Sequence, residues 1–205
     1  MHAPIAVVQQ ITPEDQARSE FYALLARLFA DGPDAALLAA IAGAPRMDGE
    51  SSPIAGAWNR LIDASAAMDP DAAAQEYTDL FVGVGKSEVN LHASFWLSGF
   101  MMERPLATLR SALAQLGIAR RDEAAMLEDH LSALCETMRL LIAGDGDRGP
   151  APIATQRAFF ERYLAPWVRE CCAAIGESPI ANYYRRVAEF TQEFMAIDRD
   201  ALVMD

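Results

Sequence analysis

The sequence is poor in the residues that build disulfide frameworks and metal centres. Its 205 residues include only three cysteines and three histidines. The cysteine number is odd and no C-x-x-C spacing occurs, so neither a disulfide framework nor a zinc cluster is expected. His2, His92 and His130 show no H-E-x-x-H or comparable spacing. We therefore predict a protein of a reducing compartment, with no metal site and no cofactor.

Basic residues and long apolar runs are scarce as well. Lysine and arginine number 17 against 29 aspartates and glutamates, which gives a formal charge of -12. Such a charge repels the phosphate backbone of nucleic acid and suits a cationic partner. No run of about 18 apolar residues occurs, and residues 1–10 lack the pattern of a secretory signal. We expect a cytoplasmic protein with no nucleic-acid partner and no stable insertion in a membrane.

Helical periodicity is what the sequence has in abundance. Apolar residues recur every three or four positions, and alternating β-branched strands are missing. Helix starts are marked by capping residues before proline, as in Thr12-Pro13 and Asp69-Pro70. The pattern predicts an all-α helical bundle of about nine helices. These helices are expected over residues 13–30, 34–41, 54–67, 70–81, 105–116, 122–143, 155–164, 166–175 and from 180 onward.

Two segments without a helical period divide this pattern. Residues 82–97 form an aromatic-bearing connection that is longer than usual between bundle helices, which is typical of functional loops. Residues 144–152 are rich in glycine and proline. We predict a hinge there, between an N-terminal bundle (1–143) and a C-terminal helical part (153–205) that packs on the same core. Such a hinge would allow either a monomer or a dimer that exchanges helices.

Residues 83–87, Gly-Val-Gly-Lys-Ser, resemble the end of a phosphate-binding loop. The first glycine of that motif would fall at Leu80, and the segment follows a helix instead of a strand, so a plain loop is favoured. A small nucleotide-dependent enzyme or switch using Lys86 and Ser87 is kept as an alternative. No nucleophile has a well-placed base, and we predict that the protein is not an enzyme.

Three ionisable residues, Glu128, Asp129 and His130, stand together at the start of a long apolar stripe. One interpretation is a solvated helix start, where carboxylates are favoured by the helix dipole. The other is a peptide-binding groove, in which a carboxylate beside an imidazole accepts hydrogen bonds from guanidinium groups and nearby aromatic residues supply apolar surface. Composition alone leaves both open.

Three blocks in a characteristic order resemble a known family. Residues 76–83, Glu-Tyr-Thr-Asp-Leu-Phe-Val-Gly, are similar to an E-Y-x-x-L-F-x-G motif and precede a loop that contains Ser94. Residues 128–138 contain Glu-Asp-His-Leu and Cys-Glu-x-Met, and residues 164–188 contain Leu-Ala-Pro-Trp and Asn-Tyr-Tyr. The chain thus resembles the TorD/DmsD-type redox-enzyme maturation chaperones, which are related to the nitrate reductase assembly chaperones.

The resemblance implies a cytoplasmic chaperone that binds the twin-arginine leader peptide and the immature catalytic subunit of a molybdopterin oxidoreductase. It would support cofactor insertion and delay export until insertion is complete. Assembly of a cytoplasm-facing nitrate reductase-like complex is the alternative. Carried over by position, the expected peptide-binding residues are Glu128, Asp129, His130, Tyr77, Leu80, Phe81, Ser94, Phe95 and Trp96. Asp129 would accept hydrogen bonds from an arginine of the leader, and His130 would orient it or contact the leader backbone.

Overall fold

The computed structural model describes residues 11–49, 51–83, 86–101, 104–119, 126–146 and 148–204. The described residues form ten α-helices and one π-helical turn, and none of them lies in a strand, which confirms the predicted all-α bundle. The elements are α1 (Pro13–Ala30), α2 (Ala35–Ala42), α3 (Pro53–Ala67), α4 (Pro70–Tyr77), η1 (Thr78–Val82), α5 (Ala93–Ser98), α6 (Arg104–Gln115), α7 (Leu131–Ala143), α8 (Ile153–Tyr163), α9 (Val168–Glu177) and α10 (Tyr183–Met204).

The helix starts that the sequence marks are capped as expected. The side chain of Thr12 accepts a hydrogen bond from the backbone N–H of Asp15, at 3.0 Å. Asp34 and Asp69 cap α2 and α4 in the same way. These caps satisfy N–H groups that have no partner within the helix, so local sequence is sufficient to fix the starts.

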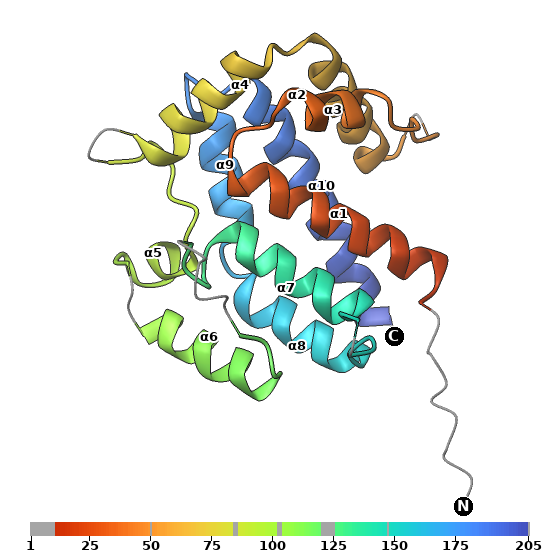
Figure 1. Cartoon of the computed structure of the whole chain (residues 1–205), viewed down its shortest axis with the longest axis vertical. Coiled ribbons are helices and arrows are strands. Elements are labelled where there is room, and N and C mark those ends of the chain that lie inside the picture. The colour runs from red at the N-terminus through yellow and green to blue at the C-terminus, as the bar shows by residue number, and fades with distance from the viewer. Residues whose placement is uncertain are drawn as a thin grey trace, which may run out of the picture.

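The core lies where α1, α7 and α10 meet (Figure 1). α1 packs along α7, and α10 packs against α3, α9 and α8. Large side chains fill the space between them, with Tyr22, Phe29, Trp167, Tyr184 and Phe190 all fully buried. Burial of this much aromatic surface is the main stabilising term of the bundle.

A buried carboxylate joins α4 to α10 across more than a hundred residues. Glu76 accepts hydrogen bonds from the backbone N–H groups of Asn182, Tyr183 and Tyr184, at 2.8, 3.0 and 2.8 Å. It therefore caps a helix that begins far away in the sequence. The first residue of the family-like block is a structural link.

The glycine that closes the same block is required by the backbone. Gly83 follows η1 with φ +64°, a region that other residues rarely adopt. A Cβ atom there would lie 2.4 Å from the carbonyl oxygen of Lys86. The chain can therefore turn out of η1 toward α5 only with glycine at this position.

A second buried polar group links α1 to the end of α10. Asp198 accepts hydrogen bonds from Arg18 Nε at 2.5 Å and from the Tyr22 hydroxyl at 2.6 Å. Its side chain is fully buried, so the ion pair is shielded from water. Burial and the Asp198 charge raise the pKa of Tyr22, which keeps its hydroxyl available as a donor. Sequence reasoning gave no sign of this network.

Two boundaries differ from the sequence-based prediction. The loop expected over residues 82–97 contains the short helix α5, which is too short to show a period. The helix expected to begin near Asp122 begins at Leu131, and residues 120–125 lie outside the described part of the chain. There the backbone pairs with the segment before α5: the N–H of Ala93 donates to Asp129 O and that of Leu131 to Leu91 O. This tertiary pairing prevails over helix propensity.

The glycine- and proline-rich segment 144–152 connects α7 to α8, which pack side by side (Figure 1). Gly144 has φ +77°, and a Cβ atom there would collide with the carbonyl oxygen of Arg148. Arg148 in turn donates to Leu116 O at 2.7 Å. The hinge, the division into 1–143 and 153–205, and helix exchange between protomers stay predictions.

Replacing Glu76 with glutamine tests the link between α4 and α10. Glu76→Gln places an NH₂ group against backbone N–H donors, so we expect the free energy of unfolding to fall by about 2–4 kcal/mol in urea denaturation. Asp79→Asn is the matched control, because it removes the same charge from an exposed position on η1 and should change stability by less than about 0.5 kcal/mol. Equal stability of the two variants would contradict the capping role.

Candidate functional site

Asp129 holds the start of α5 in place. Its Oδ2 accepts hydrogen bonds from the backbone N–H of Ser94 at 3.0 Å and from the Ser94 hydroxyl at 2.5 Å. Its backbone oxygen accepts the N–H of Ala93, so it satisfies two donors at the start of α5. Asp129 is 1% exposed, and its Oδ1 is buried without a hydrogen-bond partner in the described part of the chain. A buried carboxylate oxygen without a donor is costly unless a ligand supplies one.

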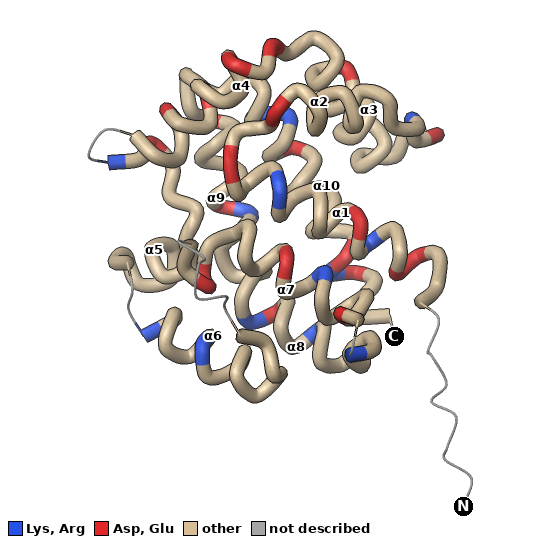
Figure 2. The backbone as a smooth tube through the Cα atoms, viewed as in Figure 1, with Lys and Arg blue, Asp and Glu red and all other residues tan. Residues whose placement is uncertain are grey.

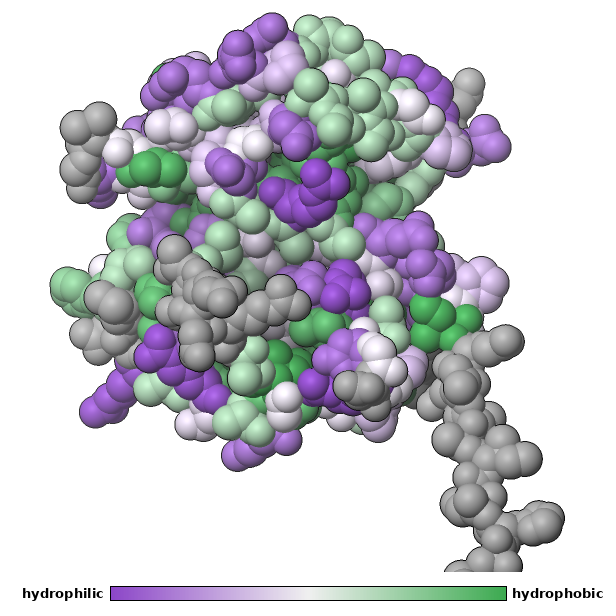
Figure 3. Space-filling view, viewed as in Figure 1, coloured by the Kyte–Doolittle hydropathy of each residue, from purple (hydrophilic) through white to green (hydrophobic). Residues whose placement is uncertain are grey.

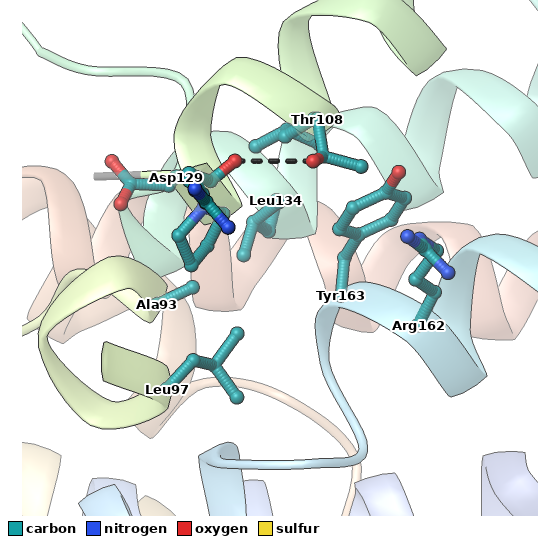
Figure 4. A pocket seen from close by; sticks show the side chains of 10 residues that line it. Ala93, Leu97, Thr108, Asp129, Leu134, Arg162 and Tyr163 are labelled. Atoms are coloured by element: carbon teal, nitrogen blue, oxygen red, sulfur yellow. Dashed lines mark hydrogen bonds between the residues drawn. The ribbon is translucent and has the colours of Figure 1, made fainter. Parts of the chain in front are cut away.

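Asp129 also lines a pocket of about 370 Å³ between α5, α6, α7 and α8. In Figure 4, Asp129 and Leu97 lie on one side of this pocket, and Arg162 and Tyr163 lie on the other. The dashed line in that view is the bond from the Thr108 hydroxyl to the backbone oxygen of α6's first residue. The lining residues are Ala93, Leu97, Arg104, Pro105, Thr108, Leu109, Asp129, Leu134, Arg162 and Tyr163. The pocket is thus mainly apolar, with one carboxylate and two guanidinium groups.

His130 is a helix cap with a neutral ring. Its Nδ1 accepts the backbone N–H of Ser132 at 3.2 Å, and it stands before the first residue of α7. Burial, helped by nearby His92, lowers the pKa of His130 to about 3. The two imidazole rings meet edge to face with centroids 4.8 Å apart. His130 therefore stays uncharged at neutral pH and positions the backbone beside Asp129.

Exposed apolar side chains lie on and just after α5, one of them in the pocket lining. Phe100 is 69% exposed and Leu97 is 42% exposed. On the face shown in Figure 3, hydrophobic residues otherwise form small separate patches among hydrophilic ones. α6 has arginines at two positions and no acidic residue, as Figure 2 shows. The pocket region therefore combines apolar and positively charged surface in a protein that is acidic as a whole.

Of the nine sequence-predicted site residues, Asp129 lines this pocket. Tyr77 and Phe81 pack against Tyr184 of α10, with ring centroids 5.8 and 5.0 Å away, and Leu80 is fully buried. The Tyr77 hydroxyl donates to the carbonyl oxygens at the end of α1. These three residues belong to the aromatic core between α1, α4 and α10.

The remaining predicted residues surround α5 and α6. Ser94 is fully buried and bonded to Asp129, while Phe95 and Trp96 are half-buried on α5. The Trp96 indole donates to the Asn90 carbonyl oxygen at 2.7 Å. Glu128 forms a two-bond ion pair with Arg110 of α6, at 3.0 Å for each bond.

Sequence reasoning missed nine of the ten residues that line the pocket, among them Leu97, Arg104 and Arg162. The approach of α5, α6 and α8 brings them together, and their spacing in the sequence carries no signal of it. Among the described residues, no group of three or more histidines, cysteines or acidic residues could hold a metal ion. Within the same residues, no helix has the length and apolar character needed to cross a bilayer.

Comparison with known proteins places this chain in a family. Residues 48–173 match the family model of the nitrate reductase delta subunit. The chain is 25% identical over 214 residues to the chaperone protein TorD of Shewanella loihica, covering 93% of this chain and 95% of that one. The crystal structure of a proposed redox enzyme maturation protein from Archaeoglobus fulgidus has the same fold, with a TM-score of 0.58, 15% identity, and coverage of 95% of this chain and 98% of that one.

The family model covers more than half of the chain, so the protein belongs to the nitrate reductase delta subunit family. More particularly, its similarity to TorD along nearly the whole chain supports a maturation chaperone of the TorD type, and that relative is named as a chaperone and not as a catalyst. This confirms the resemblance drawn from the sequence. The alternative of a small nucleotide-dependent enzyme or switch around Lys86 and Ser87 stays a prediction that none of these comparisons supports.

The low pKa of His130 predicts how stability depends on pH. Above about pH 6.5 the ring is neutral in both the folded and the unfolded chain, and it has no effect. Below that pH the imidazole takes up a proton in the unfolded chain and stays neutral in the folded chain. The free energy of unfolding therefore falls by about 1.4 kcal/mol per pH unit toward pH 3. His130→Asn retains a capping side chain and removes this titration. We expect a shallower loss of stability between pH 6.5 and 4.5 in urea denaturation, and an unchanged slope would contradict this.

Proposed function

We propose that this chain binds the twin-arginine leader peptide and the immature catalytic subunit of a molybdopterin oxidoreductase in the cytoplasm. It would support insertion of the cofactor and delay export of the client. The observation that carries the proposal is the buried carboxylate of Asp129, which lines a largely apolar pocket and has one oxygen without a donor. A basic and otherwise apolar leader matches both features: its guanidinium groups can donate to the carboxylate oxygen, and its apolar side chains can contact the apolar pocket wall.

In this proposal Asp129 is the recognition residue. Its Oδ2 is occupied by Ser94, which fixes the carboxylate, and its Oδ1 would accept a hydrogen bond from the leader. A carboxylate that is already held in place loses little conformational freedom on binding. The apolar stretch of the leader would contact Leu97 and Phe100, which are exposed beside the pocket.

The other predicted residues then act mainly by position. His130 and Ser94 hold the backbone and carboxylate of Asp129. Tyr77, Leu80 and Phe81 would support the bundle behind the site, because their contacts are with the core. Phe95 and Trp96 would shape α5, and Glu128 orients Arg110 beside the pocket.

Assembly of a nitrate reductase-like complex is the second candidate, and the matched family model favours it. The chemistry of the site would be the same, since only the client differs. Purification of this protein from its native cell, followed by mass spectrometry, separates the two. An exported oxidoreductase with a twin-arginine leader supports the first candidate, and a subunit without such a leader supports the second.

Replacing Asp129 with asparagine tests the proposed recognition. Asparagine can still accept from Ser94, but it loses the charge that would hold the leader's guanidinium. Because truncating one partner of a buried charge pair costs about 2–5 kcal/mol, we expect calorimetric titration of a twin-arginine leader peptide into Asp129→Asn to show at least about 30-fold weaker binding.

The control variant for that titration is Asp63→Asn. It removes the same charge from an exposed ion pair on α3, remote from the pocket residues, and should leave peptide affinity unchanged. Unfolding curves of both variants show whether either has lost its fold. Unchanged affinity in a folded Asp129→Asn would place the leader at another surface.

Phe100 tests the apolar part of the site. Its side chain is 69% exposed, so Phe100→Ala should leave the melting temperature within about 1–2 °C of wild type. Loss of its contact with the leader should weaken peptide binding about 5- to 30-fold in the same titration. Ile197→Ala is the control, because Ile197 is an exposed apolar residue on α10. Equal affinity of the two variants would remove Phe100 from the binding surface.

A further inference from the structure

Two arginines stand at the Asp129 pocket without a carboxylate partner in the described part of the chain. Most arginines in the described part of the chain form an ion pair, as Arg157 does with Glu161. Arg104 and Arg162 line the same pocket, are exposed, and have no ion-pair partner among the described residues. In a protein with 29 acidic and 17 basic residues, such a pair at one site is unexpected from composition.

The position of Arg104 opposes ordinary helix electrostatics. It is the first residue of α6, where the helix dipole favours negative charge and disfavours a cation. The first turn of α6 has no acidic residue to compensate. Arg162 lies in the last turn of α8, where the helix dipole favours a cation. The helix dipole therefore explains the position of Arg162 but not that of Arg104. The guanidinium groups of Arg104 and Arg162 make part of the pocket wall a positively charged region.

We propose that this positive region binds the side-chain carboxylate of an acidic residue in the client peptide. The proposal rests on the proposed function and adds a specificity to it. The pocket would then bind a peptide segment that has two polar groups of opposite kind. A hydrogen-bond donor of the peptide would bond to Asp129 Oδ1, and a nearby carboxylate of the peptide would bond to Arg104 and Arg162. The guanidinium groups match a carboxylate because each can donate two parallel hydrogen bonds.

A carboxylate fits this place better than a phosphate group. Phosphate sites at helix starts use several backbone N–H donors, and Pro105, the second residue of α6, has none. The pocket walls are mostly apolar, and exposed Leu97 and Phe100 continue that surface outward. Such a surface suits a peptide with apolar side chains.

The test uses synthetic twin-arginine leader peptides in which one glutamate is placed at each position of the apolar stretch in turn. Each is titrated into the full-length protein and compared with the peptide that has glutamine at that position. We expect at least one position at which glutamate binds about fivefold more tightly than glutamine, with the gain lost at high salt. The gain should vanish in the double variant Arg104→Gln/Arg162→Gln.

Arg157→Gln/Arg199→Gln is the matched control, because it removes the same charge from exposed, ion-paired positions and should retain the gain. Arg104→Glu/Arg162→Glu supplies a second test, since it should prefer lysine to glutamate at the same peptide position. If no position shows the gain, or if the gain persists in Arg104→Gln/Arg162→Gln, the inference is wrong.

Failure of the inference can be told from failure of the proposed function. If the leader peptide without any glutamate does not bind the wild-type protein, the proposed function fails and this inference fails with it. If that peptide binds and glutamate has no effect, only the inference fails. Inorganic phosphate is titrated in parallel, and tighter binding of phosphate than of any glutamate peptide, dependent on both arginines, would instead assign the region to a phosphate group.

Discussion

The site depends on how the two oxygens of one buried carboxylate are used. Oδ2 of Asp129 caps α5 through Ser94, and Oδ1 has no donor in the described part of the chain. The first bond fixes the second oxygen in position, because a carboxylate held at one end cannot rotate freely. α5 in turn brings Leu97 to the pocket and Phe100 to its rim. In the proposed function, a structural cap and a recognition group are therefore the same side chain, and a change at Asp129 affects both unless the replacement can still accept from Ser94.

The fold could be predicted where its determinants are local. Thr12, Asp34 and Asp69 cap the helices they precede. In each case the capping side chain and the N–H group it accepts lie within four residues of each other, so the cap can be predicted from local sequence. Prediction was wrong where a distant segment decides the backbone. α7 starts at Leu131 and not near residue 122, because the chain before it pairs with residues 91–93, and α5 exists because Asp129 caps it from 35 residues away. Periodicity contains no information on such partners.

The same limit applies to the site. Asp129 could be identified from the sequence because it belongs to a recognisable block, and its place in a pocket agrees with that expectation. Tyr77 and Phe81 belong to a block as well, yet they pack in the core against Tyr184. Arg104 and Arg162 stand more than fifty positions apart in the sequence, on different helices, and belong to none of the family-like blocks, so only their meeting at one pocket reveals them.

Apart from Asp129, the residues of the family-like blocks thus differ from those that we propose to discriminate between clients. Glu76 caps α10, Gly83 permits the turn after η1, His130 caps α7, and Asp129 caps α5. Each of these residues solves a problem of backbone geometry in this chain, and none of these contacts involves a client. Discrimination between clients needs side chains that are exposed and free of such duties, as those of Phe100, Arg104 and Arg162 are. Substitutions there are expected to change the recognised peptide without disturbing the caps, since none of the three side chains caps a helix among the described residues.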